Sequence, residues 1–174
     1  MATRNILKTL TTEHNDLREL FAQMEKTTDR AAKSREDLLN KIEKGLLPHA
    51  KWEENVFYPA FKARADRDGL KTHAEALSEH AAVEETVIPR VKAAEFATPQ
   101  FAGRVKVFGE LIDHHASEEE KTMFKMAKEM FSSEELAQFD EQYEAWKKSP
   151  EGMQAIAAAK ADSERLANTL PADE

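Results

Sequence analysis

The chain has 174 residues and a net charge of −8; 41% of the residues are hydrophobic and 33% are charged. This length supports one domain with a hydrophobic core, and this balance excludes a disordered chain. Only 5 Gly and 6 Pro interrupt it, and Ala, Leu, Glu and Lys recur throughout, so the composition favours helix. No alternating apolar runs flanked by hairpin turns are present. We therefore predict an all-α fold.

The charge and the cysteine count narrow the functional classes. An acidic chain without a basic face matches phosphates poorly, so we expect no nucleic-acid partner. With 0 Cys, the chain has no disulfide, no thiolate nucleophile and no cysteine-ligated metal site. No apolar run approaches the roughly 18 residues of a membrane span, and the first ten residues lack the apolar core of a signal peptide. We expect a cytoplasmic protein that does not bind membranes.

Four long amphipathic helices are predicted first, with turns near residues 30, 67 and 98. The first helix runs from about Asn5 to Thr28. Ser34, with Asp37 three residues later, is the expected N-cap of the second helix. Apolar residues recur at spacings of three and four in these segments, which is typical of a helix that packs in a bundle. We predict an up-down-up-down four-helix bundle.

The third and fourth helices have their own boundary signals. Gly69 is expected to mark the break before the third helix, whose apolar stripe includes Leu70 and Leu77. Thr98 and Pro99 open the fourth helix in the order N-cap, then proline at the first helical position.

Two prolines fall inside the predicted helices, Pro48 in the second and Pro89 in the third. Each removes a backbone donor, so each is expected to kink or bulge its helix. Pro48 directly precedes His49, and the distortion either helps to aim that side chain or is incidental.

Further helices are predicted after the fourth. The run from Ser132 to Glu135 is a capping signal for a fifth helix that ends near Lys148. An Ala-rich sixth segment, residues 154–168, has few large apolar side chains and is expected to be weakly anchored or dependent on a partner. We assign residues 1–131 to the bundle and residues 132–174 to a C-terminal helical extension.

Histidines and glutamates interrupt the apolar stripes of all four long helices. The histidines among them are His14, His49, His80 and His115, and the glutamates are Glu53, Glu84 and Glu119. Polar groups inside a bundle are costly unless they are paired or bound to metal. A single inward histidine is usually a hydrogen-bonded core residue. The common depth of the whole set is what favours a metal site.

That depth is set by the rise of about 1.5 Å per helical residue. His14 lies about 16 residues before the first predicted turn and His49 lies about 19 residues after it. His80 lies about 18 residues before the third turn and His115 lies about 17 residues after it. Antiparallel helices therefore bring all four imidazoles to one level, within roughly one helical turn. Glu53 and Glu119 come four positions after their histidines and share this level.

Three other polar residues are set apart. His73 is seven residues from His80, about 10 Å along the helix axis, so we expect it to be structural or near the end of the bundle. His114 points about 100° away from His115, towards a solvated stripe. Three roles remain open for Glu84: an acceptor that holds a ligand histidine, an extra ligand, or a charge at the entrance of the site.

Histidine and carboxylate ligands without a thiolate suit iron, manganese or zinc. Six protein ligands exceed the four of a structural zinc site. Two carboxylates that bridge two ions would leave each ion with two histidines and open positions. A pair of metal ions is therefore the favoured interpretation.

One sequence block occurs twice. His49-Ala-Lys-Trp-Glu53-Glu54-Asn-Val-Phe-Tyr-Pro59 is echoed by His115-Ala-Ser-Glu-Glu119-Glu120-Lys-Thr-Met-Phe124. Together with Glu13-His14-Asn15 and the Glu-His pair that ends at His80, these blocks resemble the hemerythrin-like HHE cation-binding domains over about residues 5–131. The resemblance implies two oxo- or hydroxo-bridged iron ions. It makes His14, His49, His80 and His115 terminal ligands, and Glu53 and Glu119 bridging ligands.

The chain departs from the oxygen-carrying members of that family. Those proteins use an additional histidine and an Asp in the last helix, where this chain has Glu119. It is more similar to the subgroup with four His and two Glu that includes iron–sulfur repair proteins, although it lacks their Cys-bearing N-terminal extension. The Glu-x-x-His of ferritin-like sites and the His-Glu-x-x-His of zincin proteases are both absent.

We therefore expect a non-haem di-iron protein that binds or senses O₂, NO or peroxide. An apolar wall of Phe57, Phe61, Phe108 and Met123 is expected to limit access of water. The first alternative is an enzyme of nitrosative or oxidative stress defence, which reduces peroxide or NO or donates iron for cluster repair. The second is a metal-free helical scaffold whose inward histidines only titrate. The oligomeric state is left open.

Overall fold

The computed structural model describes residues 4–171, and within this range the regular structure is entirely helical. The prediction of an all-α protein is confirmed for this part of the chain. In chain order the elements are α1 (Ile6–Glu25), α2 (Ala32–Trp52), the π-helical turn η1 (Glu53–Phe57), α3 (Tyr58–Arg64), α4 (Arg67–Ala82), the π-helical turn η2 (Val83–Val87), α5 (Ile88–Ala93), α6 (Pro99–Glu118), the π-helical turn η3 (Glu119–Met123), α7 (Phe124–Met130), α8 (Ser133–Trp146) and α9 (Pro150–Ala167).

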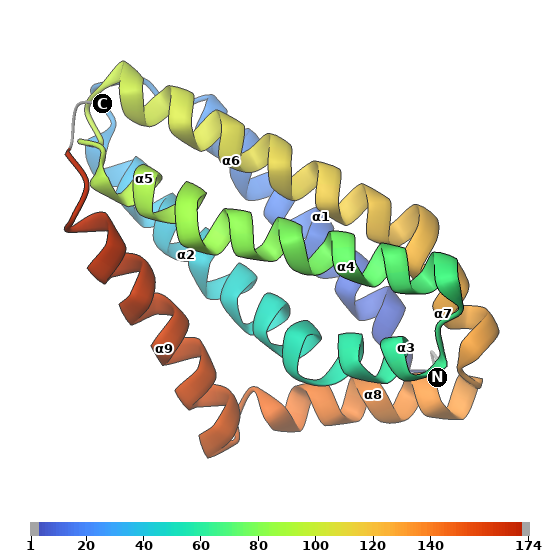
Figure 1. Ribbon diagram of the computed structural model, residues 1–174. Coiled ribbons are helices and arrows are strands. Elements are labelled where there is room, and N and C mark those ends of the chain that lie inside the picture. The colour runs from blue at the N-terminus through green and yellow to red at the C-terminus, as the bar shows by residue number, and fades with distance from the viewer. Residues whose placement is uncertain (1–3, 172–174) are drawn as a thin grey trace.

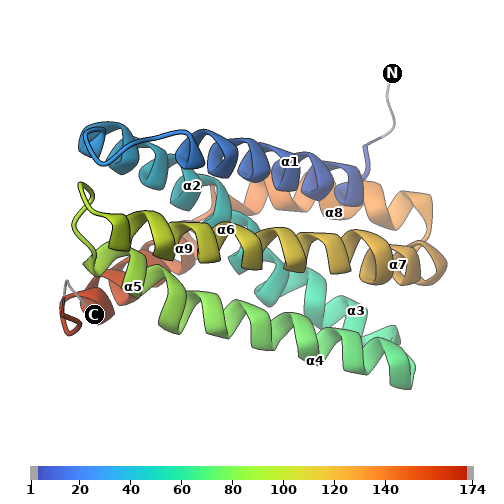
Figure 2. The same cartoon turned by 90° about the horizontal axis from the view of Figure 1, so that it is seen from above.

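Four helical rods lie side by side, and consecutive rods run in opposite directions (Figures 1 and 2). The first rod is α1 alone. The other three are composite: α2, η1 and α3 form the second, α4, η2 and α5 the third, and α6, η3 and α7 the fourth. The first rod packs against both α2 and α6. Side chains at mid-height of all four rods can therefore meet in the interior.

Side-chain caps start most of the helices. Thr98 accepts from the backbone N–H of Phe101 with Pro99 in the first turn, as predicted. The predicted break at Gly69 is wrong, because α4 begins at Arg67 and Asp66 is its N-cap, accepting from the Gly69 N–H.

The predicted start of the second helix is also wrong. The helix α2 begins at Ala32 without a side-chain cap, and Ser34 lies inside its first turn.

Each composite rod changes from α- to π-helical hydrogen bonding at mid-height. The turns are closed by a backbone N–H that bonds five residues back, from Tyr58 to Glu53, from Ile88 to Val83 and from Phe124 to Glu119. The bulge expected at Pro89 is present as η2, which ends two residues before that proline. Pro59 comes after η1 in the same way. Proline lacks a backbone N–H and cannot donate an α-helical hydrogen bond in any case. A wider turn shortly before a proline therefore costs no such bond. By contrast, α2 runs through Pro48 without interruption.

The inward face of α4 differs from the prediction. Leu70 and Leu77 are 43% and 37% exposed, whereas His73, Ala76 and His80 are buried. The inward face is thus occupied by two histidines and a small residue, and a search for large apolar side chains selects the wrong side of this helix.

Two hydrophobic clusters lie on either side of a polar layer. One cluster contains Trp52, Phe57 and Phe61, and the other contains Phe21 and Phe108. The polar layer is formed by the buried histidines and glutamates of the four rods. A polar layer between two apolar clusters is shielded from water on both sides.

The last two helices cover the rods. The helix α8 packs against α1 (Figure 2). Its side chains Tyr143 and Trp146 are buried. The helix α9 packs against α2 and α5, and Lys92 of α5 donates to Ser163 Oγ at 2.9 Å. Lys92 also pairs with the buried Glu43 at 2.6 Å, so a polar contact on the inner side of α9 joins this helix to the rods. Within residues 4–171, no helix is both long and apolar enough to cross a bilayer.

The capping box of α8 gives a pH-dependent prediction. Arg64 donates to Glu135 Oε2 at 3.1 Å and the Ser132 N–H donates to the same oxygen at 2.8 Å. These bonds hold the pKa of Glu135 at about 2, below its ordinary 4.5. A lowered pKa stabilises the fold above pH 4.5, and this contribution is lost as the pH falls from 4.5 towards 2. We expect Glu135→Gln to lower the midpoint of thermal unfolding, measured by circular dichroism, at pH 7 but progressively less below pH 4.5.

The exposed Glu134→Gln variant is the matched control, because it removes a neighbouring charge without breaking the capping box. Equal midpoints for the two variants at pH 7 would contradict the assignment.

Candidate metal centre

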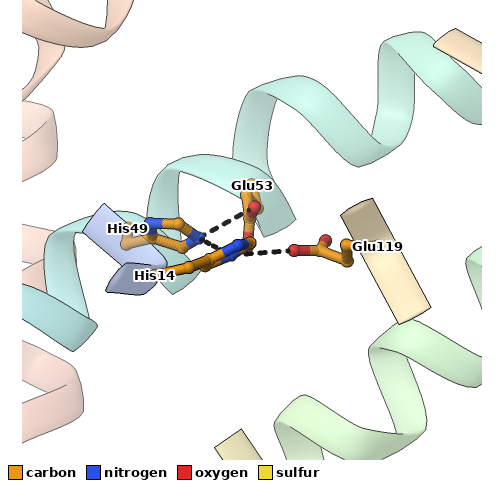
Figure 3. A group of neighbouring side chains, drawn as sticks. All are labelled: His14, His49, Glu53 and Glu119. Carbon is orange, nitrogen blue, oxygen red and sulfur yellow. Dashed lines mark hydrogen bonds and ion pairs between the residues drawn. The ribbon is translucent and has the colours of Figure 1, made fainter. Parts of the chain in front are cut away.

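The structure brings all six predicted site residues together. The side chains of His14, His49, Glu53 and Glu119 converge on one point, and those of Glu53, His80 and His115 on a second (Figure 3 shows the first group). All six residues are between 0% and 8% exposed. Within each group the ligand atoms lie within 4.8 Å of one another. Glu53 belongs to both groups.

An internal repeat explains this convergence. His14, His49 and Glu53 recur in the second half of the chain, at the same spacing, as His80, His115 and Glu119. Each half of the chain therefore supplies a hairpin with one histidine on its first rod and a His-x-x-x-Glu pair on its second. Two such hairpins packed together place two half-sites face to face.

In the first group the contacts run between imidazole nitrogens and carboxylate oxygens. His14 Nε2 lies 3.2 Å from His49 Nε2 and 3.3 Å from Glu119 Oε2. His49 Nε2 lies 3.1 Å from Glu53 Oε1. Two donor atoms that bind one ion at about 2.1 Å and at right angles lie about 3 Å apart. These separations fit a shared cation.

The second group has a similar spacing. His80 Nε2 lies 3.0 Å from His115 Nε2, and Glu53 Oε2 lies 3.6 Å from His80 Nε2. Glu119 Oε2 lies 3.6 Å from His115 Nε2. The two oxygens of Glu53 thus face different histidine pairs, and Glu119 reaches a histidine of each pair. Both carboxylates are placed between the two groups.

Each histidine is held from behind by a second carboxylate on another rod. The Nδ1 atoms of His14, His49, His80 and His115 donate to Glu120 at 2.9 Å, Glu13 at 2.9 Å, Glu54 at 2.8 Å and Glu79 at 2.6 Å, respectively. An ionised carboxylate can only accept from an imidazole, so Nδ1 carries a proton and Nε2 is the nitrogen that faces the centre. This arrangement fixes ring orientation and raises the basicity of the inward nitrogen.

These outer carboxylates were missed by the sequence analysis, although their signal was present. Glu13 and Glu79 directly precede His14 and His80, and Glu54 and Glu120 come directly after Glu53 and Glu119. Neighbouring residues on a helix point about 100° apart. The outer glutamate therefore misses its own rod's site and reaches the histidine of the adjacent rod.

The centre requires positive charge. The buried oxygens Glu53 Oε1 and Glu119 Oε2 accept no hydrogen bond of regular geometry from the described residues, and they lie 3.1 and 3.3 Å from the inward nitrogens of His49 and His14, respectively. Burial lowers the pKa of His115, but Glu119 and the other nearby carboxylates outweigh it and raise that pKa to about 8. Burial also lowers the pKa of His49, and Glu53 and Glu13 raise it well above its ordinary value. A raised histidine pKa means that the inward nitrogen holds a proton more tightly. Metal cations fit the same set of histidine nitrogens and carboxylate oxygens, and they would replace these protons.

Tyr58 is a further polar residue at the centre that the sequence analysis did not single out. Its hydroxyl donates to Glu119 Oε1 at 2.6 Å and lies 3.2 Å from His80 Nε2 and 3.4 Å from His115 Nε2. Burial raises the pKa of Tyr58, and Glu119 and Glu53 raise it further. From the sequence alone, Tyr58 cannot be distinguished from an ordinary aromatic residue of the core.

The three residues that were set apart lie outside both groups. His73 is buried edge-on against the ring of Tyr58, and the side chain of His114 is 61% exposed. Glu84 pairs with Lys51 at 2.5 Å, and Lys51 also donates to Glu54 at 2.7 Å. Of the three alternatives for Glu84, the structure favours a charge at the edge of the site.

A small cavity adjoins the centre. It has a volume of about 30 Å³ and is lined by the four histidines, Glu79 and Glu84, and a set of mainly aliphatic side chains that includes Leu17, Leu46, Val83, Ile88 and Ile112. Such a volume holds one or two water-sized molecules. None of the four residues of the expected apolar wall lines this cavity; they are buried in the two flanking clusters.

The fold and the site together define a class: a helical protein that buries four imidazoles and two carboxylates in one layer as a cation site. Residues 5–127 match the hemerythrin HHE cation-binding domain. The chain belongs to this hemerythrin family, as its repeated His-x-x-x-Glu-Glu block predicts, and it is therefore a cation-binding protein.

A DNA nickase of Nostoc sp. (strain PCC 7120 / SAG 25.82 / UTEX 2576) is similar to this chain. The two are 25% identical over 146 residues, which cover 82% of this chain and 39% of the nickase. The chain thus spans less than half the length of this curated relative. No solved structure matches the chain.

The outer carboxylates give a testable prediction. In Glu13→Gln the acceptor oxygen for His49 is kept but its charge is lost, so His49 becomes a weaker ligand. We expect affinity for ferrous iron, measured anaerobically by competition with a chromophoric chelator, to fall by roughly tenfold or more.

Glu19→Gln removes one charge from an exposed position of the same helix and is expected to bind iron like the parent. If both variants bound equally well, the role given to Glu13 would be wrong.

Proposed function

We propose that the chain is a non-haem di-iron protein that binds or senses O₂, NO or peroxide at its metal centre. The observation that carries this proposal is that two pairs of inward Nε2 atoms share two buried carboxylates. In this proposal the four rods are a hemerythrin-like four-helix bundle, residues 1–131, and residues 132–174 are its C-terminal extension. Residues 1–3 and 172–174 of these ranges lie outside the described residues.

The six residues divide between two ions. His14 and His49 would hold one ion, His80 and His115 the other, and Glu53 and Glu119 would bridge them. Iron suits this nitrogen and carboxylate set and would supply Lewis acidity and a change of oxidation state. Two histidines and two shared carboxylates leave each ion below six-coordination, so a small ligand has a place to bind.

The protein's own side chains restrict what that ligand can be. The adjoining cavity of about 30 Å³ admits only a few heavy atoms. Its wall is mainly aliphatic, so it favours small, weakly polar molecules over hydrated ions. O₂, NO and peroxide have this size.

An enzyme of stress defence is the second candidate, because the same open positions would allow reduction of peroxide or NO, or donation of iron for cluster repair. Turnover with an added reductant separates this from simple binding. We do not propose for this chain the DNA nicking that the name of the Nostoc relative states, because a chain with a charge of −8 matches phosphates poorly.

Metal analysis tests the proposal directly. Protein purified from iron-replete cells is expected to contain about two iron ions per chain. Its near-ultraviolet absorption should change on reduction and on exposure to NO. A content of one zinc, or of no metal, would defeat the proposal.

Two histidine variants sharpen this measurement. His115→Ala removes a buried inward nitrogen and is expected to lower the iron content. The adjacent His114→Ala removes an exposed imidazole from the same helix and should leave the content unchanged. Equal loss in both variants would indicate a general folding defect rather than a lost ligand.

A further inference from the structure

We propose that the phenol oxygen of Tyr58 is a ligand of the metal ion held by His80 and His115, so that the two metal positions are chemically different. This inference rests on the di-iron function proposed above. It adds a seventh protein ligand and assigns it to one ion.

The positions of three atoms carry the inference. Tyr58 Oη lies 3.2 Å from His80 Nε2 and 3.4 Å from His115 Nε2, and these two nitrogens lie 3.0 Å apart. Three donors on one face of an ion, with bonds of about 2.1 Å at right angles, form a triangle with edges of about 3 Å. The phenol oxygen completes such a triangle with the two imidazoles.

The hydrogen bonds of Tyr58 point the same way. Its single proton is donated to Glu119 Oε1 at 2.6 Å, which leaves the oxygen lone pairs directed at the inward nitrogens. Because Nδ1 of each histidine already donates to its outer carboxylate, Nε2 is the nitrogen left to bind a cation in place of a proton. A cation among these three atoms would be bound by all of them. Binding of ferric iron would release the phenol proton to solvent and leave a phenolate ligand.

The π-helical turn η1 places Tyr58 at the site. Glu53 and Tyr58 are five residues apart, and in an α-helix they would point about 140° away from each other. In η1 the Tyr58 N–H bonds to the Glu53 carbonyl, and this wider turn brings both side chains to the centre. The phenol is 0% exposed and its ring packs against His73 and His80. Its position is therefore fixed by the backbone and by packing.

The other half-site lacks this oxygen. The residue that matches Tyr58 in the second half of the chain is Phe124, whose ring stacks on His14 with centroids 5.9 Å apart. The ion held by His14 and His49 therefore has an aromatic ring where its neighbour has a phenol oxygen. We infer that an external ligand binds at this second ion, which keeps the larger number of free positions.

Absorption of the ferric protein tests the assignment. A phenolate bound to ferric iron gives a charge-transfer band in the visible region, and imidazole and carboxylate ligands do not. We expect this band in the iron-loaded protein and its loss in Tyr58→Phe, with the iron content per chain unchanged. The matched control is Tyr143→Phe, which removes the chain's other tyrosine; its hydroxyl donates to Glu13 at 2.9 Å rather than facing the metal-binding atoms. This variant should keep the band.

Resonance Raman spectra of the Tyr143→Phe protein, grown with ring-deuterated tyrosine, give an answer that does not depend on folding of Tyr58→Phe. Tyr58 is then the only tyrosine, and its ring modes should be enhanced and shift with deuteration. A chain that holds two irons without such modes, or a band that persists in a folded Tyr58→Phe variant, would overturn the ligand assignment alone. A chain that binds no iron would overturn the di-iron function and this inference with it.

Discussion

The buried negative charge of Glu53 and Glu119 is the constraint on which the structure depends. Two carboxylates at 0% and 2% exposure, between two hydrophobic clusters, are stable only if positive charge lies beside them. Four imidazoles surround them, and outer glutamates prepare these imidazoles to bind cations. Arg18, which donates to Glu120 at 2.9 Å, balances part of the outer charge. From the centre outwards, the site therefore consists of two carboxylates, four imidazoles and then four partly exposed carboxylates.

The two halves of the chain balance this buried charge with similar but not identical residues. Both supply a Glu-His pair and a His-x-x-x-Glu-Glu block at the same spacing. In one half Arg18 neutralises Glu120 directly. In the other half the residue that matches Arg18 is Glu84, which is also acidic. Lys51 lies between Glu54 and Glu84 and balances both charges. The same inequality appears at Tyr58 and Phe124, where one half-site is polar and the other is not.

Sequence reasoning located the six inward residues because it relied on counts of residues from each turn. An error of one or two residues in a turn shifts the expected depth by only about 3 Å, so the level of His14, His49, His80 and His115 was robust. The direction in which a side chain points around the helix axis is more sensitive to such an error, because each residue turns it by about 100°. The choice of Leu70 and Leu77 as inward residues assumed that the largest apolar side chains face the core, and Tyr58 could not be placed without knowing where the π-helical turns fall.

Those π-helical turns also separate the two ends of each composite rod. Every extra residue offsets the angular phase of the next segment by about 100° relative to a continuous α-helix. The segments α3, α5 and α7 therefore turn towards the core residues that lie one position later in the sequence than those that a continuous α-helix would turn inward. Deletion of one residue from 54–57, 84–87 or 120–123 would turn the five-residue bond into an ordinary α-helical one, so the far segment of the rod would keep its direction and its neighbours.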